Sequence, residues 1–364
     1  MKIPLVDLRK QHDLLREDLN NLFNDVLDKN NFVLGEYVNN FENDFKNYLN
    51  SKYCVGLNSG TAALELGLRA LGLGEGDKIA TVTNTFIATA SSIVNVDADP
   101  VFVDSNKNDA LINMEQLKEL LEKEDIKAVI PVHLYGNVCD MNKLLKLKQD
   151  YGFFLIEDCA QAHGAEFEEK KVGTFGDIGS FSFFPAKILG GIGDAGCVIT
   201  DKEEISEKLY AYRNAGRVKN EKYKHEFIAS NHRLMPLQAG VLSLKLKYLD
   251  KWIDERRNIA KFYKKELSLN NLNQDNSVYY MYVVLDENRD EIMRKMNEKN
   301  IQCGVHYPIP LHLQPAFDFL EHKEHDFVNS EFLCKNVLCI PIYQGMTEEE
   351  MKYVVESFKA VVSR

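Results

Sequence analysis

Residues 153–164 read FFLIEDCAQAHG, an apolar run that ends on two carboxylates, Glu157 and Asp158. Consecutive apolar residues are typical of a parallel strand that is buried on both faces of a sheet. The carboxyl end of such a strand lies at the sheet edge where α/β folds bind their ligands. An unpaired buried carboxylate is costly, so Asp158 needs a cation or hydrogen-bond donors there, and a protonated heterocyclic nitrogen would satisfy it. A structural salt bridge and a helix N-cap are the alternatives.

The same pattern repeats on the N-terminal side of this strand. Short apolar runs, which predict strands, alternate with amphipathic runs, which predict helices. The predicted strands are 54–57, 78–82, 100–104, 128–132 and 153–158, and the predicted helices between them are 61–71, 87–95, 114–123 and 141–151. Strict alternation of this kind indicates an α/β fold, with a mostly parallel sheet that is flanked by helices.

The remaining segments predict further elements on both sides of this region. They are a mostly helical N-terminal segment at 12–50, two strands at 180–184 and 197–200 joined by a glycine-rich connection, a long helix at 236–267, a strand at 279–285 and a closing helix at 348–362. The length of 364 residues suits about two domains. We expect a large domain of residues 1–245 and a smaller α+β domain of residues 246–364.

Composition excludes several classes of protein. The net charge is −11, from 44 Lys+Arg against 55 Asp+Glu, which disfavours a nucleic-acid-binding protein. The seven cysteines form no C-x-x-C pair and lie mostly in apolar runs, which indicates buried free thiols in a reducing compartment. We see no signal peptide and no apolar run of the ~18 residues that would suggest a membrane span. The sequence therefore predicts a cytoplasmic protein with no metal site.

Two further stretches carry candidate chemistry. Residues 58–61, NSGT, place a sharp turn and a hydroxyl at the start of a predicted helix, where free N–H groups bind anions such as phosphate. An ordinary helix cap is the alternative. Lys187 is the only charged residue between Asp177 and Asp194, and its neighbours are aromatic, small or aliphatic. Such a lysine can form a Schiff base, although its stem can also pack while its ammonium group reaches water.

Two other motifs are ambiguous. Residues 191–196, GIGDAG, match the dinucleotide-binding fingerprint, which requires a following helix. The next residues instead predict a strand, so we interpret the glycines as a turn beside Lys187 and disfavour a nicotinamide enzyme. The basic stretch 213–225 could meet a diphosphate, and a solvated loop is the alternative.

A phosphate-binding turn, an acid at a strand end and a Schiff-base lysine together suit pyridoxal phosphate. With these features in this order, the sequence resembles the DegT family of sugar-nucleotide aminotransferases, which are fold-type I pyridoxal-phosphate enzymes. The resemblance runs nearly end to end, through residues 3–8, 32–35, 58–64, 84–89, 131–136, 157–165, 182–196, 231–234 with 238–239, and 306–308 with 311–314.

The resemblance implies a role for each matching residue. For the cofactor they are Lys187 as the Schiff-base lysine, Asp158 at the pyridinium nitrogen, Gln161 near the ring hydroxyl, Phe86 on the ring face, and Gly60, Thr61 and Ser182 at the phosphate. Asn231 would reach the phosphate of the neighbouring subunit, which implies a homodimer with shared active sites. Lys222, His306 and Tyr307 would lie near the sugar nucleotide.

The family also implies transamination of a nucleotide-linked keto-sugar with L-glutamate as donor. Residues 185–190 with Gly193-Asp194, and residues 306–312, resemble members that act on 3-keto sugars, so we favour a dTDP-3-keto-6-deoxyhexose. A C4-aminotransferase and a non-catalytic sensor on the same fold are the alternatives. A sugar dehydratase is disfavoured because such relatives have His at the position of Lys187. Departures from the family pattern are Phe184, His232 and Met235-Pro236.

Overall fold

A seven-stranded mixed sheet forms the centre of the computed structural model, which describes residues 1–218, 221–267 and 271–362. The strand order is β1-β9-β8-β5-β4-β2-β3, with bounds β1 Tyr53–Leu57, β2 Lys78–Val82, β3 Asp99–Val103, β4 Ile126–Ile130, β5 Phe154–Asp158, β8 Ile178–Ser182 and β9 Gly196–Thr200. β9 is antiparallel to both of its neighbours, and the other pairs are parallel. The predicted α/β fold is confirmed, and each of these strands begins and ends within two residues of its predicted bounds.

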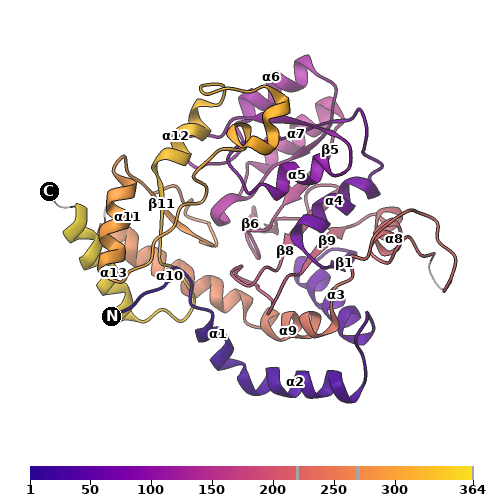
Figure 1. The fold of residues 1–364 in the computed structure, drawn as a ribbon, viewed down its shortest axis with the longest axis horizontal. Coiled ribbons are helices and arrows are strands. Elements are labelled where there is room, and N and C mark those ends of the chain that lie inside the picture. The colour runs from indigo at the N-terminus through magenta and orange to yellow at the C-terminus, as the bar shows by residue number, and fades with distance from the viewer. Residues whose placement is uncertain (219–220, 268–270, 363–364) are drawn as a thin grey trace.

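Helices cover both faces of this sheet (Figure 1). Their bounds are α1 Arg9–Leu14, α2 Arg16–Asp28, α3 Glu36–Leu49, α4 Gly60–Ala70, α5 Ala88–Val94, α6 Met114–Lys123, α7 Met141–Tyr151, α8 Glu203–Tyr212, α9 Pro236–Leu246 and α10 Leu249–Leu267. Neighbouring residues of one strand enter opposite cores: Leu155 packs with residues of α3, α6, α7 and α9, and Ile156 with residues of α4, α5 and α8. Burial on both faces is the physical reason for the continuous apolar runs.

A third core lies in the C-terminal part. It is built on the antiparallel pair β10 Tyr282–Leu285 and β11 Val337–Ile340, with α11 Arg289–Glu298 and α13 Glu348–Val362. In Figure 1 these helices lie to the left of the large sheet. Ile3 also joins this core through a bridge to Ile301, so the N-terminus packs against the C-terminal part. The domain division at residue 245 stays a prediction.

The other described elements are short. They are the hairpin β6 Glu166–Phe167 and β7 Lys170–Lys171, helix α12 Val328–Asn336, and 3-10 helices at Leu134–Gly136, Leu311–Leu313 and Pro315–Leu320. The predicted long helix at 236–267 is two helices, separated at Lys247 and Tyr248. Among the described helices, none has the length and apolar character needed to span a bilayer.

The predicted strand at 279–285 is shorter than expected, because it begins only at Tyr282. Tyr279 adopts a φ of +50°, which is outside the extended region. The carbonyls of Tyr279 and Tyr280 accept hydrogen bonds from Arg256 Nη1, at 3.0 and 3.2 Å. These two carbonyls are directed to Arg256, and the pairing with β11 starts after them, at Tyr282.

Candidate active site

Asp158 ends β5 at the carboxyl edge of the sheet, and its side chain is buried. Thr89 Oγ1 of α5 donates to Asp158 Oδ2 at 2.9 Å, and the Ala160 N–H donates to Oδ1 at 3.1 Å. Burial raises the pKa of the Asp158 carboxyl, while these two hydrogen bonds and the charge of Lys187 act in the opposite direction. Among the described residues, no cationic side chain forms an ion pair with Asp158, so its carboxylate lacks a charged partner within the chain.

Lys187 lies in the turn after β8, the strand that pairs with β5. Its N–H donates to the Phe184 carbonyl at 2.8 Å, which fixes the start of this turn. The Lys187 side chain is half-buried, and its Nζ lies 4.5 Å from the ring centroid of Tyr280. An aromatic face at this distance attracts an ammonium group. The sequence pattern did not point to Tyr280, because only the tertiary fold brings it beside Lys187.

The helix start predicted to bind an anion is the N-terminus of α4. Ser59 caps it, since its Oγ accepts the N–H of Ala62 at 3.1 Å. The N–H groups of Gly60 and Thr61 lie in the first turn of α4 and have no acceptor among the described residues. A Cβ on Gly60 would lie 2.5 Å from the Cβ of Ser182, so only glycine allows α4 to approach the end of β8. Two free N–H groups beside a serine hydroxyl form a site for a phosphate.

Gln161 links the strand edge to the C-terminal part of the chain. Its Oε1 accepts the N–H of Tyr135 at 2.7 Å, and its Nε2 donates to the Tyr307 hydroxyl at 3.1 Å. Tyr135 adopts a φ of +61°, a conformation that is costly for a bulky residue. The Tyr307 ring lies 5.8 Å from that of Phe86, which is 53% exposed. An aromatic pair therefore forms one wall of the site.

The buried His163 and the half-buried His306 lie within the electrostatic reach of Lys187. Burial lowers the pKa of His306 to about 4, and the charge of Lys187 adds to this effect. Burial also lowers the pKa of His163 to about 3, and this ring packs against Phe181 and Phe183. Both imidazoles are therefore neutral at pH 7. His306 Nδ1 is a buried atom without a hydrogen-bond partner among the described residues.

Two predicted site residues lie apart from this cluster. Asn231 is exposed and bridges to Asn214, and Lys222 is exposed on the loop that follows α8. No contact joins either residue to Asp158 within the described chain. Lys222 lines a groove of about 1070 Å³. Arg213, which begins the basic stretch, is buried in an ion pair with Glu42 and is thus engaged within the protein.

Three departures from the family pattern have separate surroundings. Phe184 is 51% exposed beside the Lys187 turn. The His232 carbonyl accepts the N–H of Asn58 at 3.0 Å, which ties the segment around Asn231 to the end of β1. Met235 is the N-cap residue of α9, and Pro236 occupies the first turn, where a missing N–H costs nothing.

Glu157 has hydrogen-bond partners on a different segment from those of its neighbour Asp158. Its carboxylate accepts the N–H groups of Gly173, Phe175 and Gly176 at 2.7–2.8 Å, and His133 Nε2 lies 3.3 Å away. His133 Nδ1 accepts the N–H of Cys139, so the ring proton is on Nε2 and points to Glu157. Cys159 completes a buried cluster of metal-ligand residue types. Because Glu157 is occupied by the turn that precedes β8, we assign this cluster a structural role.

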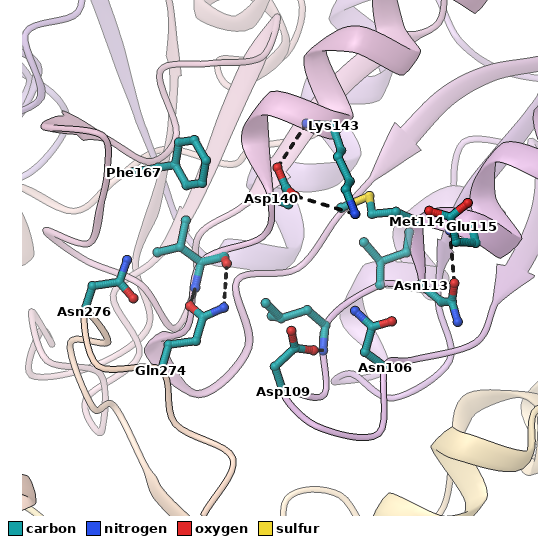
Figure 2. A pocket seen from close by; sticks show the side chains of 13 residues that line it. Asn106, Asp109, Asn113, Met114, Glu115, Asp140, Lys143, Phe167, Gln274 and Asn276 are labelled. Atoms are coloured by element: carbon teal, nitrogen blue, oxygen red, sulfur yellow. Dashed lines mark hydrogen bonds and ion pairs between the residues drawn. The ribbon is translucent and has the colours of Figure 1, made fainter.

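A second pocket, of about 410 Å³, contains none of the predicted site residues (Figure 2). Its polar groups are used locally: Asp140 caps α7 through the N–H of Lys143, and the Gln274 amide bonds to both backbone groups of Val138. Phe167 forms an apolar wall across the pocket from α6. We assign this pocket no function.

The main cluster combines a buried acid without a cationic partner, a lysine amine over an aromatic ring and an open helix N-terminus. These groups fit the protonated ring nitrogen, the carbonyl carbon and the phosphate of pyridoxal phosphate, in that order. The fold and the site thus define a pyridoxal-phosphate-dependent aminotransferase. The chain belongs to the DegT/DnrJ/EryC1/StrS aminotransferase family, whose model matches residues 13–359.

Three similar proteins span nearly the whole chain. One is 37% identical over 361 residues, 98% of each chain: dTDP-3-amino-3,6-dideoxy-alpha-D-galactopyranose transaminase from Aneurinibacillus thermoaerophilus. Another is 36% identical over 365 residues, 98% of this chain and 97% of its own: a pleiotropic regulatory protein from Geobacillus stearothermophilus. The crystal structure of NtdA from Bacillus subtilis, with bound cofactor PMP, is 30% identical, covers 100% of this chain and 86% of its own, and has a TM-score of 0.93.

Proposed function

We propose that this enzyme transfers the amino group of L-glutamate to C3 of a dTDP-linked 3-keto-6-deoxyhexose and releases a dTDP-3-amino-3,6-dideoxyhexose. The buried Asp158, which has no cationic partner and lies within electrostatic reach of Lys187, is the observation that carries the aminotransferase chemistry. The position of amination is supported by the resemblance in residues 185–190 and 306–312, and by the name of the Aneurinibacillus relative.

The chain's own groups divide the chemistry between them. Pyridoxal phosphate, when bound, supplies a ring that delocalises the electron pair left at the donor carbon. Lys187 Nζ would hold the carbonyl carbon of the cofactor, and its amine, once released, would carry the proton between the two reacting carbons. The Asp158 carboxylate would keep the ring nitrogen protonated, because a protonated ring accepts the electron pair of the donor carbon more readily.

Other residues position the cofactor. The N–H groups of Gly60 and Thr61 and the hydroxyl of Ser182 bind the phosphate. Gln161 is oriented by the Tyr135 N–H, which its Oε1 accepts, and by the Tyr307 hydroxyl, to which its Nε2 donates. The second N–H of Nε2 is the donor left for the ring hydroxyl. Phe86 packs on one face of the ring.

We assign substrate contacts to His306, Tyr307 and Lys222, and a homodimer to the active form. Asn231 would reach the phosphate bound by the partner subunit. The exposed apolar side chains of Phe86, Phe184 and Ile228 support this arrangement, because a second subunit or a substrate would cover them.

A visible absorption spectrum, before and after excess glutamate, tests the cofactor and the first half-reaction. We expect a yellow protein whose absorption band falls as the amino group is transferred. Lys187→Ala should abolish turnover and leave the fold and the dimer intact, as checked by circular dichroism and gel filtration. A colourless protein that does not take up added pyridoxal phosphate, or wild-type-like transamination by Lys187→Ala, would contradict the proposal.

A C4-aminotransferase is the second candidate, because members of one family can act on substrates whose keto group is at C3 or at C4. Incubation with a dTDP-3-keto and a dTDP-4-keto-6-deoxyhexose, followed by NMR of the product, distinguishes the two positions. The name of the Geobacillus relative keeps a non-catalytic regulatory role as a third candidate. If the protein reacts with glutamate but converts neither keto-sugar, another acceptor is favoured. If it reacts with no amino donor, the regulatory role is favoured.

A further inference from the structure

Helix α9 directs two polar side chains at the glycine-rich turn that follows Lys187. Gln238 and Lys245 are seven residues apart and so lie on the same face of the helix. Gln238 Oε1 accepts the N–H of Ile192 at 2.8 Å, and Lys245 Nζ donates to the carbonyl of Gly190 at 2.8 Å. Both side chains are buried, Lys245 completely. α9 therefore holds this turn at two points.

The Gln238 contact accounts for part of the misleading G-x-G-x-x-G pattern. A Cβ on Gly191 would lie 2.5 Å from Gln238 Oε1, and one on Gly193 would lie 2.4 Å from Gln238 Nε2. These glycines thus make room for a side chain of α9. The close approach of Gly190 is to the turn itself, because its Cβ would lie 2.2 Å from the Pro185 carbonyl.

Lys245 is unusual because its amine is buried and no carboxylate among the described residues pairs with it. Apart from Gly190, its described partner is His12 Nε2 of α1, at 3.2 Å. Burial lowers the pKa of Lys245 to about 8. Burial, and secondly the charge of Lys245, lower the pKa of His12, so the imidazole is a neutral acceptor. Burying an ammonium group without a counter-ion costs stability, and a hydrophobic side chain would fill the same space at lower cost.

The contact with Gly190 closes the short turn that carries Lys187. The Lys187 N–H donates to the Phe184 carbonyl at 2.8 Å, and the Gly191 N–H donates to the Phe183 carbonyl at 2.8 Å. Ile188 is fully buried between these points. The turn that carries Lys187 is thus held at three backbone groups: the N–H of Lys187, the N–H of Gly191 and, through Lys245, the carbonyl of Gly190.

We propose that Lys245 is a positioning residue for Lys187: its amine holds the Gly190 carbonyl, closes the 185–190 turn and ties that turn to helix α1 through His12. This inference rests on the role proposed above for Lys187. It assigns to Lys245 no contact with the cofactor or the substrate.

Lys245→Met tests the proposal, because methionine fills a similar volume but has no donor. We expect the rate of the half-reaction with glutamate to fall about tenfold, which corresponds to about 1.4 kcal/mol. In the cofactor-free protein, the amides of Gly191 and Ile192 should exchange faster with solvent, while the unfolding temperature at pH 7 does not fall. Lys245→Gln retains N–H donors and should recover part of the rate. Lys247 is an exposed lysine near the end of the same helix, so Lys247→Met is the matched control. It should change neither the rate of the half-reaction nor the amide exchange of the turn.

A folded Lys245→Met variant with wild-type rate and unchanged local exchange would overturn the proposal. If that variant does not fold, Lys245→Gln decides: a folded, active glutamine variant supports the proposal, and a glutamine variant that also fails to fold assigns Lys245 a general structural role instead. The exchange measurement needs no cofactor. It therefore separates failure of this inference from failure of the proposed function, which the wild-type spectrum reports.

Discussion

At the residue scale, the two decisive side chains could be recognised from their sequence context. Asp158 follows an apolar strand, and Lys187 is an isolated charge, so each has a physical signature in the linear sequence. Thr89 and Tyr280 have no such signature. Thr89 reaches Asp158 only because α5 packs at the end of β5, and Tyr280 reaches Lys187 from the C-terminal part of the chain. Contacts between distant segments are the part of the site that local patterns do not encode.

Asp158→Asn should reduce turnover about 10²- to 10³-fold, because a neutral amide does not hold the proton on the ring nitrogen. The same substitution should leave the stability of the folded protein unchanged or raise it. Burial raises the pKa of Asp158 in the folded state, so its contribution is favourable at acidic pH and is lost as the pH rises through the folded-state pKa. Without cofactor at pH 7, the asparagine variant should unfold at the same temperature as the wild type or at a higher one.

Thermal unfolding of both cofactor-free proteins between pH 4 and 7 checks this sign, since the advantage of the variant should grow with pH. A variant that is unfolded at pH 7 would instead indicate that Asp158 has a structural ion pair.

At the element scale, the sequence placed the sheet well and the segment boundaries around the site less well. Pro131 has no N–H to donate, which agrees with β4 ending at Ile130, before the predicted boundary. The predicted strand 180–184 ends at Ser182, because the chain must leave the sheet there to form the Lys187 turn. Periodicity identifies an element, but side-chain contacts such as those of Arg256 with the segment before β10 influence where it begins.

Helix α4 offers a test of the phosphate site with a control on the same helix. Gly60→Ala would place a Cβ 2.5 Å from that of Ser182 and push the helix start away from β8. We expect at least about tenfold weaker binding of pyridoxal phosphate, a loss of about 1.4 kcal/mol. Gly67→Ala has only ordinary contacts, at 3.4 Å or more, and should stabilise the helix by up to about 1 kcal/mol. Fluorescence titration and thermal unfolding measure both effects, and equal affinities for the two variants would contradict the site.

At the scale of the whole molecule, the large sheet and the C-terminal part of the chain contribute side chains to one site. The two faces of the large sheet fix Asp158 and Ser182, while the C-terminal part supplies Tyr280 and Tyr307. Asn231 and Lys222 remain outside this cluster in a single chain. Sequence patterns report on one chain at a time, so whether these two residues complete the site of a second subunit is a question for experiment.

Mixed dimers of two inactive variants answer that question. Lys187→Ala and Asn231→Ala subunits should each be impaired alone, since one lacks the reacting amine and the other lacks a phosphate ligand. If Asn231 serves the partner's site, a mixed dimer contains one site with both residues intact. Random exchange of equal amounts in a two-fold symmetric dimer then leaves about a quarter of all sites complete. Refolding the variants together and measuring turnover should recover about that fraction of wild-type activity. If Asn231 instead acts within its own subunit, every site in the mixture lacks one of the two residues, and activity stays at the level of the separate variants.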